Sequence, residues 1–306
     1  MKKNVKYAVI ILNYNTINDA IRAAESVIKN AKSDDYIICL ADGASTKQYD
    51  RDLIKSIKIK NVVTVQLHKN DGYAKGNNRA IEFILSKYKP QYVVIMNPDV
   101  YLIEEGTIDN LIERIEQSNS RVVGAQPLVW NYRYGDDARY QQNIRKVQDY
   151  FEVCLSSFYP LRLIFGDRYK DMTYMNKVPY EEEILFYVPS GAFFIINTDF
   201  FLEVNMFDEN TFLYYEEYIL GYKLKEKGYK LLFSPQYRVK HAHGKSTGYS
   251  RYSVNEFGTK KMIESKCYYA SKYLRVGKVK IFLIWILNYL DYYLKKLFLL
   301  IKFGKG

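Results

Sequence analysis

The sequence of 306 residues has too few cysteines for a disulfide-rich protein, and it lacks the features of an exported or a repetitive one. Its three cysteines, Cys39, Cys154 and Cys267, have no metal-ligand spacing and cannot all pair, which favours a reducing compartment. The N-terminal run MKKNVKYAVIILNYN has two early lysines but no small-residue cleavage site, so it is more typical of a strand than of a signal peptide. No internal repeat or low-complexity block is present. The sequence predicts a globular, cytoplasmic protein.

Negative charge is scarce in the C-terminal tail. From Lys260 onward there are eleven Lys or Arg residues against two acidic ones, which is +9 of the formal net charge of +11. The preceding 259 residues carry 34 basic and 32 acidic side chains. A uniformly basic surface would have indicated nucleic acid, whereas a nearly neutral body with a basic, aromatic tail favours an anionic membrane surface as partner. We expect no nucleic-acid partner, and a merely solvated basic tail is the alternative.

The tail also lacks a uniformly apolar run. The segment 279–303 is long enough to cross a bilayer, but it contains charged residues. On a helix, five of its polar residues fall within about an 80° arc: Lys280, Asn288, Asp291, Lys295 and Lys302. This pattern predicts an amphipathic helix in the membrane interface. Packing on its own domain or on a second subunit is the alternative, so a homodimer is left open.

Three apolar runs stop abruptly at polar residues: YAVIILNYN from Tyr7, DYIICLADGAS from Asp35 and YVVIMNPDV from Tyr92. Strands are predicted near 7–13, 36–41, 62–67, 92–97 and 121–125, and helices near 18–31, 48–58, 74–88 and 105–118. Such alternation predicts an α/β fold with a mostly parallel sheet flanked by helices. Because open α/β sheets bind ligands at the carboxyl ends of their strands, the three runs predict a nucleotide site.

The pattern changes after residue 126. Residues 127–183 are rich in Tyr, Arg and Gln and have weak periodicity, which is typical of an active-site loop with short helices. Regular structure resumes with an apparent strand over 186–197. We therefore expect a nucleotide-binding half at 1–126, a second half at 127–254 that recognises a further substrate, the acceptor, and carries catalysis, and a basic amphipathic helical tail at 255–306.

Seven short motifs occur in a characteristic order: ILNYN, ADGAS, NDGYAKGNN, MNPDV, PSGAFFI, FDENTFLYYEE and HAHGKS. Each is weak alone, but together they resemble the inverting family 2 glycosyltransferases of the GT-A fold. The resemblance runs from about Tyr7 to Ser246 and is strongest to enzymes that assemble bacterial capsule and O-antigen polysaccharide, including rhamnosyltransferase-like members. It implies a nucleotide-sugar donor, a divalent cation and an acceptor hydroxyl.

The resemblance implies a metal site at Asp99, which matches the metal-binding end of the family's DxD-like motif. Asn97 stands where a first Asp often sits, so the site has one negative charge fewer. Mg²⁺ or Mn²⁺ with oxygen ligands would neutralise the donor diphosphate. His241 fits the family's H-x-x-G-x-S pattern as a further metal ligand, with His243 as a nearby rival. The alternatives are a turn or helix-capping aspartate and a structural histidine.

The donor site is expected along the strand ends and the glycine-rich loop. Asp42 matches the family residue that contacts the base or ribose, although an Asx-type turn with Gly43 is the alternative. The glycines of NDGYAKGNN allow close backbone approach, or the loop merely caps the next helix. The other residues predicted to bind the donor are Asn13, Tyr14, Asn15, Asn70, Gly72, Gly76, Asn77 and Asn97.

Inversion requires a general base that takes the acceptor proton while the oxygen attacks the anomeric carbon. By the resemblance Glu217 supplies this base, and Glu216 is its neighbour and substitute. Two adjacent carboxylates also suit an ordinary first turn of a helix. The family often has a further Asp where this chain has Ile219. Gly191, Ala192 and Asp208 match the acceptor side.

Together these features predict a peripheral enzyme on the cytoplasmic face of the cell membrane. It would add one sugar from a UDP- or dTDP-sugar to a lipid-linked oligosaccharide. The processive synthases of this fold have a Gln-x-x-Arg-Trp motif, and neither Trp130 nor Trp285 follows an Arg. The rival hypothesis is a degenerate nucleotide-binding or membrane-scaffolding protein, motivated by Asn97 and Ile219. A sugar nucleotidyltransferase is a third reading, but a glycine- and arginine-rich loop near the first strand is missing.

Overall fold

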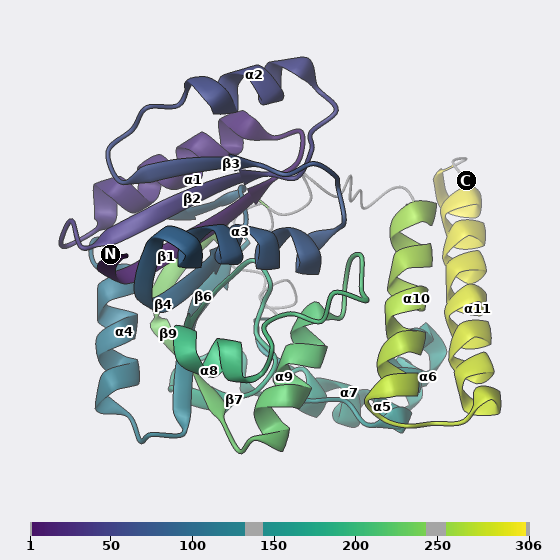
Figure 1. Ribbon diagram of the computed structural model, residues 1–306. Coiled ribbons are helices and arrows are strands. Elements are labelled where there is room, and N and C mark those ends of the chain that lie inside the picture. The colour runs from purple at the N-terminus through teal and green to yellow at the C-terminus, as the bar shows by residue number, and fades with distance from the viewer. Residues whose placement is uncertain (1, 132–142, 243–254, 304–306) are drawn as a thin grey trace.

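Strands and helices alternate in the N-terminal part, as the sequence predicts (Figure 1). The computed structural model describes residues 2–131, 143–242 and 255–303. The elements of this part are β1 (Lys3–Asn13), α1 (Ile17–Asn30), β2 (Tyr36–Asp42), α2 (Gln48–Ser56), β3 (Val62–Gln66), α3 (Tyr73–Lys87), β4 (Tyr88–Met96), β5 (Val100–Leu102), α4 (Thr107–Gln117) and β6 (Val122–Trp130).

Short helices and mixed strands follow. They are α5 (Tyr150–Ser157), α6 (Tyr159–Ile164), α7 (Gly166–Met172), the 3-10 helix η3 (Met175–Lys177), β7 (Ile184–Phe186), β8 (Phe193–Asn197), α8 (Thr198–Glu203), α9 (Glu216–Glu226), β9 (Lys230–His241), α10 (Glu256–Lys272) and α11 (Lys278–Phe303). The short helices expected between 127 and 183 are present, but most of WNYRYGDDARYQQN lies outside the described residues.

The described strands form one sheet in the order β3-β2-β1-β4-β8-β6-β9-β5, with β7 paired to β9. The four strands from β3 to β4 are parallel, so their carboxyl ends meet at one edge. From β4 onward antiparallel pairs enter, because β8 runs against both β4 and β6. β6 crosses the expected boundary at residue 126, and the two expected halves share this one sheet.

Alternation along the strands builds a core on each face of the sheet. In β1, Tyr7, Val9 and Ile11 pack with α1, α2 and α4, whereas Ala8 and Ile10 pack with α3, α8 and α9. Successive side chains of a strand point to opposite faces, so an almost wholly apolar strand is buried on both sides. These two layers hold the strand ends in place.

A third cluster lies beside the sheet, where α10 and α11 stand side by side against α5 (Figure 1). It is rich in aromatic side chains, including Tyr215 of the segment before α9 and Tyr269 of α10. In the described part of the chain, no helix combines the length and apolarity that crossing a membrane would require. The helical tail is thus present and is packed against the body.

The apparent strand over 186–197 is divided in two. β7 ends at Phe186 and β8 begins at Phe193. Between them, the backbone N–H of Ser190 donates to the side chain of Gln126 rather than to a strand partner, at 2.7 Å. Pro189 has no N–H to offer a ladder. The interruption leaves residues 187–192 as a loop between β7 and β8.

Candidate active site

The carboxyl ends of β1 and β2 are tied together by Asn13. Its amide donates to Oδ1 of Asp42 at 3.0 Å and to the hydroxyl of Ser45 at 3.3 Å. Its carbonyl oxygen accepts from the backbone and hydroxyl of Thr16, just before α1. Asn13 is fully buried. It lies at the predicted strand end, but its hydrogen bonds go to the protein, so it braces the site.

The carboxylate of Asp42 is largely occupied by its own loop. It accepts from Asn13, from the Ser45 hydroxyl and, at 3.1 Å, from the Ser45 backbone N–H. A carboxylate offers about four acceptor positions, so about one remains. The carboxylate thus binds the backbone N–H three residues on, at Ser45, rather than two residues on as in the Asx-type turn considered from the sequence. Contact with a base or ribose stays a prediction.

The neighbouring polar residues also bind within the protein. Asn15 accepts from the backbone N–H groups of Thr46 and Lys47, at 2.9 and 3.0 Å, and adopts a positive φ of 60°. Tyr14, also at this strand end, is half-buried. The side chain of Asn77 donates to the Tyr73 carbonyl within α3. These residues shape the crevice wall, and their contact with a donor is untested.

The glycine-rich loop packs closely on the segment before α9. Asn70 accepts from the Gly72 N–H, and Gly72 has φ +89°. A Cβ at Gly72 would stand 2.0 Å from the Phe212 carbonyl oxygen, so only glycine fits there. Gly76 lies against Leu12, where a Cβ would be 2.7 Å from Cδ2. The loop therefore joins the nucleotide half to the catalytic half.

Asp99 and His241 come together at the ends of β5 and β9. Val100 pairs with His241 in the sheet, and Nε2 of His241 lies 3.3 Å from Oδ1 of Asp99. Asp99 is buried, and among the described residues its Oδ1 accepts no hydrogen bond. A buried carboxylate oxygen left in this state has a large desolvation cost, which a cation would offset.

This pair fits a divalent cation as part of a ligand set. Carboxylate oxygen and imidazole nitrogen both suit Mn²⁺, and carboxylate oxygen suits Mg²⁺. The described ranges contain no group of three or more His, Cys, Asp or Glu side chains able to hold a metal. His243, the rival ligand, and Gly244 and Ser246 of the same motif lie outside the described residues.

The two glutamates begin α9 after an unusual backbone segment. Tyr214 and Tyr215 both have positive φ, 71° and 70°, and Glu216 follows as the first helical residue. Side chains other than glycine rarely adopt this conformation, and strain of this kind is common at functional sites. The turn directs Glu216 inward, where it is buried and its Oε1 has no hydrogen-bond partner among the described residues.

Burial raises the pKa of Glu216 well above the ordinary glutamate value, and the neighbouring charge of Glu217 raises it further. The pKa of Glu217 is raised by burial too, but the backbone at the start of the helix, Arg145 and the Gly191 backbone favour its charged form. The two environments therefore raise the pKa of Glu216 more than they raise the pKa of Glu217. Glu216 is therefore the group that keeps a proton, and Glu217 is the better candidate for a base.

Gly191 lies directly against Glu217. A Cβ on Gly191 would be 2.0 Å from Oε1 of Glu217, so a larger residue here would displace the Glu217 carboxylate. The next residue, Ala192, accepts from the Asn97 N–H at 2.9 Å. Asn97 lies two residues before Asp99, so this one loop contacts both the base and the NPD segment. Gly191 and Ala192, two of the predicted acceptor residues, thus lie between the predicted base and the NPD segment.

Two residues that the sequence did not single out lie beside Glu217. The Tyr73 hydroxyl donates to the Gly191 carbonyl at 2.5 Å. Arg145 is paired through its backbone with Val188, and its guanidinium lies 5.9 Å from the Tyr218 ring centroid. Nothing in the sequence indicates Arg145, because it lies in a weakly periodic stretch. Tyr73 could have been found, because it is part of the motif NDGYAKGNN.

Asp208, expected on the acceptor side, holds α10 against the body. Its carboxylate accepts from Asn210 and from the hydroxyls of Tyr268 and Tyr273. Burial by itself would raise the pKa of Asp208, but hydrogen bonds from Tyr273 and Asn210 reverse this and lower it. The structure thus shows an anchoring role for Asp208, and its contact with an acceptor stays a prediction.

Comparison with known proteins now identifies the family. The model of glycosyl transferase family 2 matches residues 8–194. This chain belongs to glycosyl transferase family 2. Rhamnosyltransferase WbbL of Escherichia coli (strain K12) is 23% identical over 181 residues, which are 56% of this chain and 60% of that relative. The matched region therefore spans less than two thirds of that relative's length.

Solved glycosyltransferases share the fold. Mannosyltransferase PcManGT from Pyrobaculum calidifontis, in complex with GDP-Man and Mn²⁺, has a TM-score of 0.57 and 14% identity, covering 93% of this chain and 69% of that one. S. aureus TarS 1–349 has a TM-score of 0.52 and 16% identity, covering 94% and 80%. These likenesses confirm the predicted GT-A fold, with its C-terminal helix.

Proposed function

We propose that this family 2 glycosyltransferase moves one sugar, with inversion, from a UDP- or dTDP-sugar to a hydroxyl of a lipid-linked glycan in bacterial surface polysaccharide synthesis. Glu217 is the general base. The observation that carries the proposal is the position of Glu217, held against Gly191 on a loop that also contacts the NPD segment. A base must lie beside both the acceptor and the leaving group, and this loop supports that arrangement.

The raised pKa of Glu217 suits its role. A carboxylate with a higher pKa is a stronger base, and it transfers protons most efficiently when its pKa lies near the working pH. Burial raises this pKa, while Arg145 and the Gly191 backbone limit the rise and keep a charged fraction. The acceptor proton would pass to Glu217 as the acceptor oxygen bonds to the anomeric carbon and the nucleoside diphosphate leaves.

A divalent cation would be held by Asp99 and His241. It would supply positive charge to the diphosphate as the sugar–phosphate bond breaks. The unpartnered Oδ1 of Asp99 supports this reading, as does the Mn²⁺ named with PcManGT. The name of WbbL supports a deoxyhexose donor, and UDP-GlcNAc is named with TarS, so both deoxyhexosyl and hexosyl transfer are to be tested.

The deciding experiment is a calorimetric titration of wild type, Asp99→Ala and Asp99→Asn with UDP and with dTDP, each with and without Mn²⁺. We expect wild type to bind one nucleotide in a metal-dependent way and both variants to lose at least about tenfold in affinity, or about 1.4 kcal/mol. Asp167→Asn removes a fully exposed carboxylate and is the matched control.

Circular dichroism and thermal unfolding would show that each variant is folded. Metal-dependent binding lost only at Asp99 would identify the donor nucleotide and support the site. Failure of folded wild type to bind either nucleotide would contradict the proposal. It would favour the degenerate scaffold suggested by Asn97 and Ile219.

A further inference from the structure

Helix α11 turns Asn288 and Asp291 toward the protein. Asn288 is buried and accepts from the Lys266 ammonium of α10 at 3.0 Å, and Lys266 also donates to the Ser157 hydroxyl at 3.1 Å. Asp291 accepts from the Tyr159 N–H of α6 and lies 3.5 Å from Arg162. These contacts set the rotation of α11. Two members of the polar arc seen in the sequence therefore face the protein, whereas Lys280, Lys295 and Lys302 of the same arc are exposed.

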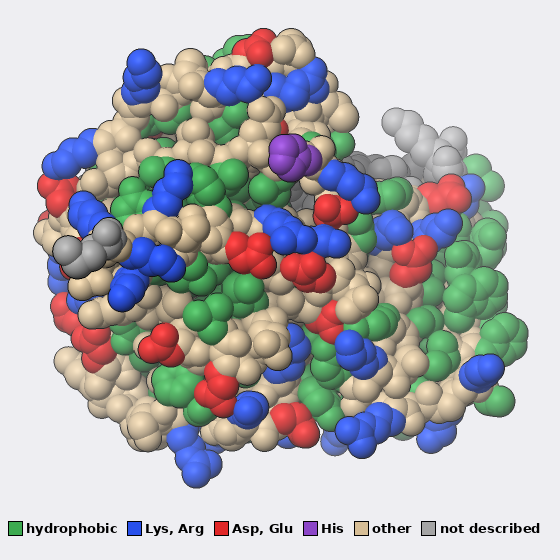
Figure 2. Space-filling view, viewed as in Figure 1, with side chains coloured by type: hydrophobic (Ala, Val, Ile, Leu, Met, Phe, Trp, Pro, Cys, Tyr) green, Lys and Arg blue, Asp and Glu red, His purple; other side chains and the backbone are tan. Residues whose placement is uncertain are grey.

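The outer face of α11 is apolar and unpartnered among the described residues. Val279 is 84% exposed, Leu297 53% and Ile301 77%. At 3.6 residues per turn the outward side chains fall within about a 120° arc without a single charge: Val279, Phe282, Leu283, Leu290, Tyr293, Leu294, Leu297, Leu300 and Ile301. Figure 2 shows this continuous hydrophobic surface along the side of the molecule where Figure 1 places α11.

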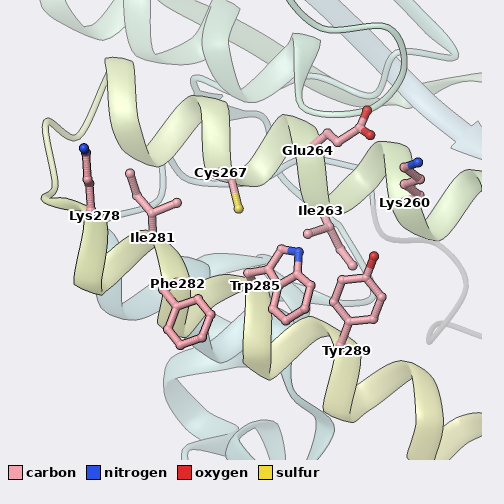
Figure 3. Close-up of a pocket in the computed structure, with 9 residues that line it drawn as sticks. All are labelled: Lys260, Ile263, Glu264, Cys267, Lys278, Ile281, Phe282, Trp285 and Tyr289. Carbon is pink, nitrogen blue, oxygen red and sulfur yellow. The ribbon is translucent and has the colours of Figure 1, made fainter.

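Lysines and aromatic rings border this outer face. On the same projection Lys278 and Lys296 lie on one edge and Lys280 on the other. Along the first edge Trp285 stacks between Phe282 and Tyr289, with ring centroids 6.0 and 4.4 Å away (Figure 3). These rings line a cavity of about 470 Å³ between α10 and α11. Trp, Tyr and Lys are the residues that favour the boundary between lipid and water.

We propose that the outer face of α11 lies in the plane of an anionic lipid bilayer. Its apolar arc would be buried among the acyl chains, with Trp285, Tyr289 and the flanking lysines at the level of the headgroups. Residues 255–303 contain ten basic and three acidic side chains, which complements anionic lipid. In a pair formed by two copies of α11, the lysine edges would oppose each other, so a second copy fits this surface less well.

Helix α6, which contacts α11, also has exposed apolar side chains. Its residues Leu163 and Ile164 are 65% and 71% exposed, and α6 is joined to α11 through Asp291. The contacts at Asn288 and Asp291 therefore hold α11 against α10 and α6 and leave its apolar arc exposed.

The test uses the full-length protein and sedimentation with vesicles of phosphatidylcholine and phosphatidylglycerol in equal parts, with pure phosphatidylcholine for comparison. Wild type should bind the mixed vesicles better, and added salt should weaken this preference. Leu290→Glu with Leu297→Glu should reduce binding more than about tenfold. Leu185→Glu with Leu202→Glu adds the same charge at exposed leucines of β7 and α8 and should leave binding unchanged.

A second readout follows Trp285 directly. The chain has two tryptophans, so Trp130→Phe leaves Trp285 as the sole one. Its fluorescence should shift to shorter wavelength on mixed vesicles, and this shift should vanish in the Leu290→Glu, Leu297→Glu background. Because the substituted leucines are exposed, thermal unfolding should be unchanged.

Three results would overturn the proposal. The first is absence of wild-type binding to mixed vesicles, and the second is equal loss in the control variant. The third is a wild-type dimer in solution that the α11 variant converts to monomer, which would assign the surface to a second copy. The inference goes beyond the proposed function, and nucleotide titration without vesicles separates the two: either can fail alone.

Discussion

Buried polar side chains at the predicted site differ in whether the protein itself fills their hydrogen bonds. At the ends of β1 and β2, Asn13 and Asp42 are fully buried and hydrogen-bonded to each other and to Ser45. At the predicted metal and base positions, Asp99 and Glu216 are also buried, yet each keeps an oxygen without a hydrogen-bond partner among the described residues. Burial is similar, but only the Asn13–Asp42 network is complete without a ligand.

This difference separates residues that stabilise the fold from residues that act on a ligand or a proton. A satisfied buried network stabilises and rigidifies the strand ends, whereas an unsatisfied buried carboxylate costs stability and is retained where a ligand or a proton is needed. Substitutions in the Asn13–Asp42 network should therefore change stability most, and those at Asp99, Glu216 and Glu217 should change ligand binding, turnover or pH dependence.

The largest effect is expected for Glu217→Gln. The amide keeps the size of the side chain but cannot accept the acceptor proton, so kcat should fall about 10²- to 10⁴-fold while nucleotide affinity stays unchanged. Donor turnover and calorimetry on the same preparation measure both quantities. Glu226→Gln, at the exposed end of the same helix, is the control. An unchanged kcat in Glu217→Gln would remove Glu217 from the role of base.

A smaller effect, on stability, is expected for Asn13→Ala. The change removes hydrogen bonds to Asp42, Ser45 and Thr16 and leaves buried groups unpaired, which should cost about 2–4 kcal/mol of unfolding free energy. Urea denaturation measures the loss. Asn18→Ala, at an exposed position of α1, should change stability by less than about 0.5 kcal/mol. Equal losses in both variants would contradict the bracing role of Asn13.

The smallest effect is a gain in stability for Glu216→Gln. Burial raises the pKa of Glu216, so the folded protein holds this proton at pH values where the unfolded chain has released it. The contribution of Glu216 to stability is therefore complete below the ordinary carboxyl pKa of about 4.3 and declines as pH rises toward the raised value.

The glutamine variant should thus be more stable than wild type at neutral and alkaline pH, and the difference should shrink as the solution is acidified. Thermal unfolding over a pH series measures this, with exposed Glu113→Gln as the control. A pH-independent difference would mean that the change acts through packing and not through the proton.

Local patterns predicted most of the fold and the positions of the strand-end residues. Apolar runs that stop at polar residues placed Asn13 and Asp42 at the ends of β1 and β2, where the structure has them, and Asp99 lies in the turn between β4 and β5. Two features could not be predicted in this way. Gly191 and Glu217 are 26 positions apart along the chain, and Arg145 lies in a stretch without periodicity, so only folding brings them together.

Helix α11 shows which property of a helix its sequence predicts and which it does not. The spacing of Lys280, Asn288, Asp291, Lys295 and Lys302 determined that the tail is amphipathic, because the helical period is a local property. Which side faces the protein was decided by tertiary structure. Lys266 provides a buried partner for Asn288, and the backbone of Tyr159 provides a partner for Asp291; satisfying those groups leaves the apolar side outward. Periodicity defines the faces of a helix, but only its neighbours determine which one is covered.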